Sequence, residues 1–331
     1  MRNLAALLVL AACAGADPVS IDAYPSAVRE ATCRYLARCG DVESIAACQG
    51  LNLGLTVAFT TSELSALDMG KIVYDASNAG ACIDALANRE CDLTSQSNRF
   101  LPDVCRTIAV GALHGGQACA FDEECISRTC AVPACFAACC LGACSGDDPP
   151  VRPRVGQSCA HVPCDAGSFC DETQSCVALK AVGMRCTGPA ECQYSLGCTR
   201  GACEPLPELG EPCSDACRDA GTTCSPTSQI CVRAGLAGAA CTLSTVGTDC
   251  SPQYPCDVTG HCSGGIALGE ACGEGDMCAG DGAVCDVPVG AAGGVCALPK
   301  PDGAACGRNA ACDSFYCDPF TLVCAPEPVC L

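Results

Sequence analysis

The sequence predicts a small disulfide-rich repeat array, with little regular secondary structure and short β-hairpins, preceded by a small all-α module stapled by disulfides. Three observations lead to this fold class. Cysteine fills 39 of the 331 positions, above the tenth of a chain that marks a disulfide scaffold. Aromatic residues make up only 4% and tryptophan is absent, so the chain lacks the large side chains of a conventional core. A glycine-led cysteine pattern also recurs along the chain.

The chain begins with a short apolar segment. Arg2 is followed by an apolar run from Leu4 to Leu10, which is too short to cross a bilayer but long enough for a secretory signal. The next residues, Leu10-Ala11-Ala12-Cys13, resemble the lipobox of bacterial lipoproteins. The resemblance implies cleavage after residue 12, acylation of Cys13 and sorting to the outer membrane. Ala14-Gly15-Ala16 is an alternative site for ordinary signal peptidase, which would release a soluble protein.

Residues 13–21 are expected to form a tether, and residues 22–113 a helical module with six cysteines. Helical spacing with a glycine stop predicts one helix in 25–40. A second is expected after Asp41 as N-cap. Others are expected in 62–70, in 75–90 capped by Asp75, and from Pro102 to Val110. Antiparallel helices joined at Gly40 would bring Cys33 and Cys48 level, which predicts a disulfide between them.

From Gly116 the chain becomes a repeat with variable loops. Each of seven units begins with a glycine three residues before a cysteine. The middle five units contain four cysteines each, whereas the first contains seven and the last five. The expected domains are a first unit at 114–144, a proline-rich linker at 145–155, and six further units in 156–331. The glycines and cysteines that open the units are Gly116/Cys119, Gly156/Cys159, Gly183/Cys186, Gly210/Cys213, Gly238/Cys241, Gly269/Cys272 and Gly303/Cys306.

The cysteines could bind a metal, carry out redox chemistry or form structural disulfides. Zinc and iron–sulfur sites favour close cysteine pairs, and thioredoxin-like chemistry favours C-x-x-C, but the chain contains no C-x-x-C. Disulfides fit the even number that remains once Cys13 is acylated or removed. Apart from Cys33 and Cys48, the spacing leaves partners open, including those of Cys39, Cys82, Cys91, Cys105, Cys119, Cys125, Cys130, Cys135, Cys159, Cys164, Cys170, Cys176, Cys186, Cys192, Cys198, Cys203, Cys306, Cys312, Cys317 and Cys324.

Parity adds a hypothesis about the two odd units. If each unit closes on itself, one thiol is left over in the first unit (Cys139, Cys140 or Cys144), and Cys330 is left over in the last. These two could bond each other, cross to other units or join two chains. The neighbours Cys139 and Cys140 are expected to have different partners, because a ring between adjacent cysteines is strained.

The spacing of Cys186, Cys192, Cys198 and Cys203, with Glu191 before the second cysteine, resembles the Dickkopf N-terminal cysteine-rich pattern. Cys119, Cys125, Cys130 and Cys135 follow it too, and Cys306, Cys312, Cys317 and Cys324 lie close to it. The whole chain resembles cysteine-rich lipoproteins of Gram-negative bacteria that place a helical module before such repeats. The signalling function of animal Dickkopf proteins is not carried over.

These features predict a non-enzymatic protein for adhesion or ligand binding, located at the outer membrane, at the cell surface or secreted. The protein would be attached to the membrane through the lipid anchor at Cys13, and its ligand would be an extracellular protein or glycan. A net charge of −19 argues against nucleic-acid binding. No catalytic residues, metal ligands or cofactors are expected, although acidic glycine-rich loops in 273–286 leave calcium open. Alternatives are a secreted protease inhibitor, an enzyme with its site in the helical module, or an inert spacer.

Overall fold

The computed structural model describes residues 16–53, 59–99, 102–133, 140–160, 162–214, 216–242, 249–257, 259–273, 276–280 and 282–326. Cys13, Cys135, Cys139 and Cys330 lie outside these ranges. The fold class predicted from the sequence is confirmed. The α-helices occur in the first third, and short antiparallel sheets make up most of the regular structure in the rest. The described cysteines form 17 disulfides, three in the first third and 14 in the rest.

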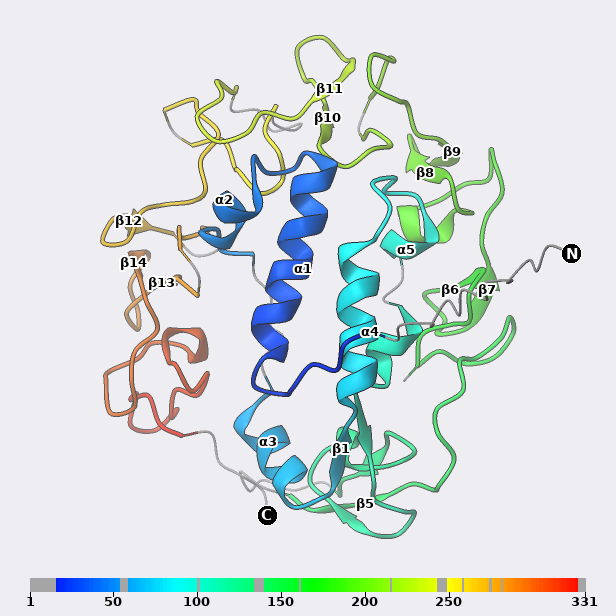
Figure 1. The fold of residues 1–331 in the computed structure, drawn as a ribbon, viewed down its shortest axis with the longest axis vertical. Coiled ribbons are helices and arrows are strands. Elements are labelled where there is room, and N and C mark those ends of the chain that lie inside the picture. Colours follow the sequence, from blue (N-terminus) through cyan, green and yellow to red (C-terminus); the bar gives the residue numbers. More distant parts are fainter. Residues whose placement is uncertain are drawn as a thin grey trace, which may run out of the picture.

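The helical module is built on two helices that lie side by side at the centre of the molecule (Figure 1). They are α1 (Tyr24–Cys39), which ends at Gly40 in a left-handed conformation, and α4 (Ala76–Ala87), whose first amides are capped by Asp75. Val28 and Ala31 of α1 pack against Ala79, Cys82 and Leu86 of α4. The shorter elements are α2 (Ile45–Gln49), α3 (Thr61–Asp68), α5 (Gln96–Arg99) and the 3₁₀ turn η1 (Asp103–Arg106).

Two local predictions in this module are wrong. Ser44, not Asp41, caps α2, because Asp41 is buried and its Oδ1 accepts a 2.9 Å hydrogen bond from the amide of Gly221. The helix expected from Pro102 to Val110 is limited to η1. The chain then forms strand β2 (Ala109–Gly111), which pairs with β1 (Ile72–Tyr74). In the sequence, β1 precedes α4 and β2 follows it. A strand partner so far away in the sequence leaves no local signal.

The module's disulfides are Cys33–Cys48, Cys39–Cys91 and Cys82–Cys105. The first is the pairing that the two-helix arrangement predicts. Residues 17–21, assigned to a tether from the sequence, pack on the module instead. The amide of Val19 donates to Ala76 O at 2.9 Å, and the hydroxyl of Tyr74 donates to Val19 O at 2.8 Å.

The seven units share one construction. Within each, the first cysteine bonds the third and the second bonds the fourth. The pairs are Cys119–Cys130 and Cys125–Cys144, Cys159–Cys170 and Cys164–Cys176, Cys186–Cys198 and Cys192–Cys203, Cys213–Cys224 and Cys217–Cys231, Cys241–Cys256 and Cys250–Cys262, Cys272–Cys285 and Cys278–Cys296, and Cys306–Cys317 and Cys312–Cys324. Each bond closes a short loop and contributes about 3 kcal/mol by restricting the unfolded chain.

The leading glycine of each unit has a specific backbone role. In unit three, Gly183 has φ +78° and its amide donates to the carbonyl of the fourth cysteine, Cys203, at 2.8 Å. The same bond forms in all seven units at 2.7–2.8 Å, and each of these glycines has positive φ. A side chain would strain that conformation, so the repeat requires glycine there.

This bond corrects the assignment of the first unit. Gly116 donates to the carbonyl of Cys144, and Cys125 is bonded to Cys144. Cys144 is therefore the fourth cysteine of unit one, where the sequence resemblance placed Cys135. It is also not a leftover thiol. The stretch with Cys135, Cys139 and Cys140 is an insertion between the third and fourth cysteines.

The hairpins of the units are short. The strands are β3 (Ala118–Cys119), β4 (Cys130–Ala131), β5 (Gly142–Cys144), β6 (Ser168–Cys170), β7 (Cys176–Ala178), β8 (Leu196–Thr199), β9 (Ala202–Pro205), β10 (Thr222–Cys224), β11 (Cys231–Arg233), β12 (Ala271–Cys272), β13 (Val284–Asp286) and β14 (Gly294–Ala297). The 3₁₀ turns are η2 (Asp122–Glu124), η3 (Pro189–Glu191) and η4 (Asn309–Ala311).

The joints between units are ordered. In every unit the amide after the second cysteine donates to the carbonyl three residues before the leading glycine, as Gln193 does to Lys180 at 2.9 Å. From unit two onward, the next leading glycine follows the fourth cysteine by seven residues, as Gly183 follows Cys176. From unit two onward, the loops inside the units therefore vary in length, whereas the joints between units do not.

The units form a nearly complete ring around α1 and α4 (Figure 1). The ring starts with unit one below the helices. It passes β6–β7 on the right and β10–β11 at the top, and it ends with unit seven at the lower left. Units four and five contact the module directly. Tyr254, Cys250 and Cys262 pack against Leu36 and Val42 in one buried cluster.

Candidate ligand-binding cleft

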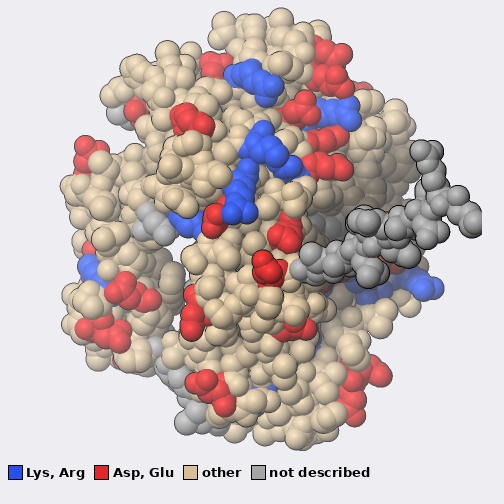
Figure 2. Space-filling view, viewed as in Figure 1, with Lys and Arg blue, Asp and Glu red and all other residues tan. Residues whose placement is uncertain are grey.

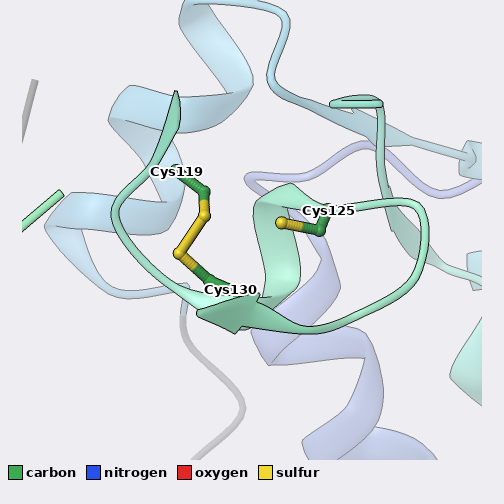
Figure 3. Close-up of side chains that lie close together, drawn as sticks. All are labelled: Cys119, Cys125 and Cys130. Carbon is green, nitrogen blue, oxygen red and sulfur yellow. A yellow bond between two sulfur atoms is a disulfide. The ribbon is translucent and has the colours of Figure 1, made fainter. Parts of the chain in front are cut away.

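The cysteines were the first candidates for chemistry. Several sulfur triplets lie close enough together to resemble metal sites, among them Cys119, Cys125 and Cys130. Figure 3 shows the bond from Cys119 to Cys130, with the side chain of Cys125 beside it. The sulfur of Cys125 is itself bonded to Cys144. A disulfide sulfur has no thiolate with which to bind zinc. Every cysteine in the described ranges, Cys140 included, is disulfide-bonded.

This thiol state is typical of a protein that folds in an oxidising compartment outside the cytoplasm. Among the described residues, no helix is both long enough and apolar enough to cross a bilayer.

A cleft of about 510 Å³ lies where the helical module meets units five, six and seven. Figure 2 shows the surface hollowed between the helices and the units on the left of the view. The module contributes Asn52 and Leu53, and unit five contributes Pro252 and Gln253. Unit six provides Asp276, Met277, Cys278, Ala283, Val284 and Cys285, and unit seven provides Arg308 and Ala310. We call this the four-way cleft.

Hydrogen bonds between the module and unit six, and between units six and seven, hold the walls of the four-way cleft. Asn52 Nδ2 donates to Ala283 O at 2.7 Å and ties the module to unit six. The guanidinium of Arg308 donates to Cys285 O and ties unit seven to unit six. At Gly307 the chain passes so close that an added Cβ would lie 2.3 Å from Val287 O.

The lining offers opposite charges and an amide. Asp276 accepts a 2.7 Å hydrogen bond from the amide of Gly273, which fixes its carboxylate. The side-chain amide of Gln253 makes no hydrogen bond to a described residue, and the buried Nε of Arg308 has no acceptor there. Met277 is 41% exposed and adds a flexible apolar surface. The arrangement suits a ligand with both polar and apolar groups.

The acidic loop of unit six is only partly in the described ranges, because Glu274 and Asp281 lie outside them. Asp286 is ion-paired with Lys300 at 2.6 Å, and Asp276 holds the Gly273 amide. These two carboxylates are therefore engaged in local structure.

A second cleft, of about 410 Å³, lies between the module and unit two. Glu90, Asp103 and Asp165 contribute carboxylates to it, and Arg152 forms an ion pair with Asp103. Polar side chains of the module converge in this second cleft, as an enzymatic site in the module would require. Unit two forms part of the same cleft.

The sequence alone did not reveal the four-way cleft. Asn52 lies 201 positions before Gln253, Arg308 lies 55 positions after it, and the three belong to no motif, so only the closure of the ring brings them together. No protein-family model, curated protein sequence or solved structure matches this chain.

Proposed function

We propose that the chain is a non-enzymatic, lipid-anchored protein of the cell surface, which binds a peptide segment of an extracellular protein in the four-way cleft. The lipid anchor is Cys13, and the repeats are relatives of the Dickkopf N-terminal cysteine-rich pattern. The observation that supports binding most strongly is the convergence of four parts of the chain on one open cleft.

The cleft is suited to binding because its walls are held in place. Each contributing unit carries two interlocked disulfides, and Asn52 and Arg308 join the parts to one another. A wall that is ordered before binding costs little conformational entropy when the ligand arrives.

The lining favours a peptide over a glycan. Sugar rings are commonly stacked on aromatic faces, and the described residues that line the four-way cleft include no aromatic side chain. The Gln253 amide matches the hydrogen-bonding groups of a peptide backbone, while Met277 and Leu53 match apolar side chains. Asp276 and Arg308 would select ligand charges of opposite sign.

A peptide-display selection tests the proposal. Random peptides are selected on the oxidised protein, and the enriched peptides are synthesised and titrated by fluorescence anisotropy. Met277→Trp places a bulky ring in the cleft, whereas Met184→Trp places the same ring on the 51% exposed Met184 of unit three. The expected result is a loss of at least tenfold in affinity for Met277→Trp and less than twofold for Met184→Trp.

Two outcomes would overturn the proposal. One is the absence of any enriched peptide whose affinity depends on Met277. The other is binding on a glycan array that Met277→Trp abolishes, which would keep the cleft as a binding site and replace the ligand class.

A further inference from the structure

We infer that the protein rests on the bilayer with one fixed face, in which residues 151–155 contact the phospholipid headgroups. The segment reads Val-Arg-Pro-Arg-Val and is named here the VRPRV strip. The inference rests on the proposed anchor at Cys13, and it adds the surface that meets the membrane and the lipid chemistry that this surface recognises.

The first step concerns the distance between anchor and folded body. The chain is fixed to the helical module from Asp17 onward, because Val19 is hydrogen-bonded to Ala76 and Tyr74. Asp17 lies so close to α4 that a Cβ added at Gly80 would be 2.0 Å from its carbonyl oxygen. Only residues 14–16 separate Cys13 from Asp17. At about 3.5 Å per residue, the acylated cysteine lies within about 15 Å of α4.

The second step places the VRPRV strip on the same side. Arg152 forms an ion pair with Asp103 in η1, and η1 is fixed to α4 by Cys82–Cys105, with Cα atoms 4.8 Å apart. Residues 16–21 cross α4 toward the side that carries β6 and β7 (Figure 1). The strip is therefore linked through η1 to α4, the helix that the N-terminal segment crosses.

The third step is the chemistry of the strip. Val151 is 85% exposed and Val155 is 60% exposed, so two apolar side chains project into solvent beside two arginines. Arg154 is exposed and has no ion-pair partner among the described residues. Exposed apolar side chains that alternate with cations suit the boundary between acyl chains and phosphates.

The charge around the strip differs from that of the whole chain, whose net charge is −19. Arg106 lies beside Arg152 and Arg128, and its pKa is lowered by burial and by these guanidiniums. The acidic neighbours are Glu90, Asp103 and Asp165 in the adjacent cleft, with Asp147 and Asp148 just before the strip in the sequence, and Asp103 is paired with Arg152. Figure 2 shows acidic side chains spread over the visible face, together with a group of Lys and Arg near the top of the view. In the strip, Arg154 is the exposed cation without an ion-pair partner among the described residues, and it would contact an anionic headgroup layer.

The test uses the absence of tryptophan from the chain. Val151→Trp and Val155→Trp each introduce a single indole into the full-length lipidated protein. Val289→Trp is the control, because Val289 is 65% exposed between β13 and β14. These strands lie on the other side of α1 and α4 from β6 and β7 (Figure 1). Each variant is reconstituted into phosphatidylethanolamine–phosphatidylglycerol vesicles that contain nitroxide-labelled lipid.

The expected result is at least twofold stronger quenching at positions 151 and 155 than at position 289. Equal quenching at the three positions overturns the inference. Cys13→Ser separates this failure from failure of the anchor. If the wild type floats with vesicles, Cys13→Ser does not, and quenching is still equal, the anchor is retained and the fixed face is rejected. If both float equally, the proposed anchor itself is rejected.

Discussion

The hydroxyl of Tyr254 donates a 2.6 Å hydrogen bond to Glu43 Oε2, which joins unit five to the loop after α1 across 211 positions of sequence. Glu43 Oε1 also accepts from the amide of Ala237 at 2.8 Å. Burial alone would raise the pKa of Glu43, but these bonds and one from its own amide hold the pKa below its ordinary value.

The docking of unit five is therefore expected to depend on pH. A carboxyl whose pKa is lower in the folded state stabilises that state above its unfolded pKa, about 4.3, and the stabilisation is lost as the pH falls through the folded value. Hydrogen exchange at Ala237, corrected for the intrinsic rate, should show protection falling below about pH 4. In Glu43→Gln this fall should be absent. The same fall in both proteins would contradict the assignment.

Gly221 of unit four packs closely on the helical module. Its φ is +69°, and an added Cβ would lie 2.3 Å from the carbonyl oxygen of Cys39. Gly70 has nearly the same φ, +70°, and open space around it. Gly70→Ala should cost about 1 kcal/mol from backbone strain. Gly221→Ala should cost more, because the backbone must also move.

Guanidinium denaturation with disulfides intact measures both costs. Equal losses in Gly221→Ala and Gly70→Ala would mean that unit four is not closely docked on Cys39.

The ion pair between Lys71 and Glu124 is the most buried in the described ranges. The Glu124 side chain is fully buried, Lys71 Nζ lies 3.1 Å from its Oε1, and the amide of Ala120 donates to its Oε2 at 2.6 Å. Lys71→Met would leave a buried carboxylate without its cation, at an expected cost of about 3–5 kcal/mol in the free energy of unfolding.

Unit three provides the matched comparison. Glu191 pairs with Lys180, but its side chain is 15% exposed and Thr187 also donates to it. Lys180→Met should therefore cost less than Lys71→Met, and Lys71→Met with Glu124→Gln should recover part of the loss. Urea titrations would contradict this if both lysine variants lost the same stability.

Cys330 has few partners left. Every described cysteine except Cys140 is bonded to another described cysteine, and the partner of Cys140 lies outside the described residues. In an oxidised monomer with Cys13 acylated, Cys330 is therefore expected to bond Cys135, Cys139 or Cys140. Mass spectrometry of unreduced peptides should recover Cys330 attached to the peptide that contains residues 135–140. A free Cys330 thiol or a disulfide-linked dimer would contradict this.

The sequence predicted those parts of the fold that depend on local chemistry. Gly40 and Asp75 gave the end of α1 and the start of α4, because caps act over one helical turn. The leading glycines stood out by their recurrence, and each has positive φ in the structure. The prediction that Asp41 caps a helix is wrong because its hydrogen-bond partner, Gly221, lies 180 positions away in the sequence.

The pairing within the units could not be predicted, since four cysteines allow three arrangements and spacing does not select one. The four-way cleft could not be predicted either. Gln253 and Arg308 meet Asn52 only because joints of constant length turn the array around α1, and that curvature has no counterpart in composition or periodicity.

The interlocked pairing has a consequence for proteolysis. Any peptide bond between the first and fourth cysteines of a unit is spanned by at least one disulfide, so one hydrolytic nick there leaves the polypeptide in a single piece. Between one unit and the next, the joints, such as the stretch between Cys203 and Cys213, are unspanned by the bonds described. A bond from Cys330 back to unit one would span the joints from unit one to unit seven as well. The molecule would then keep all its fragments after a single cut at any of them.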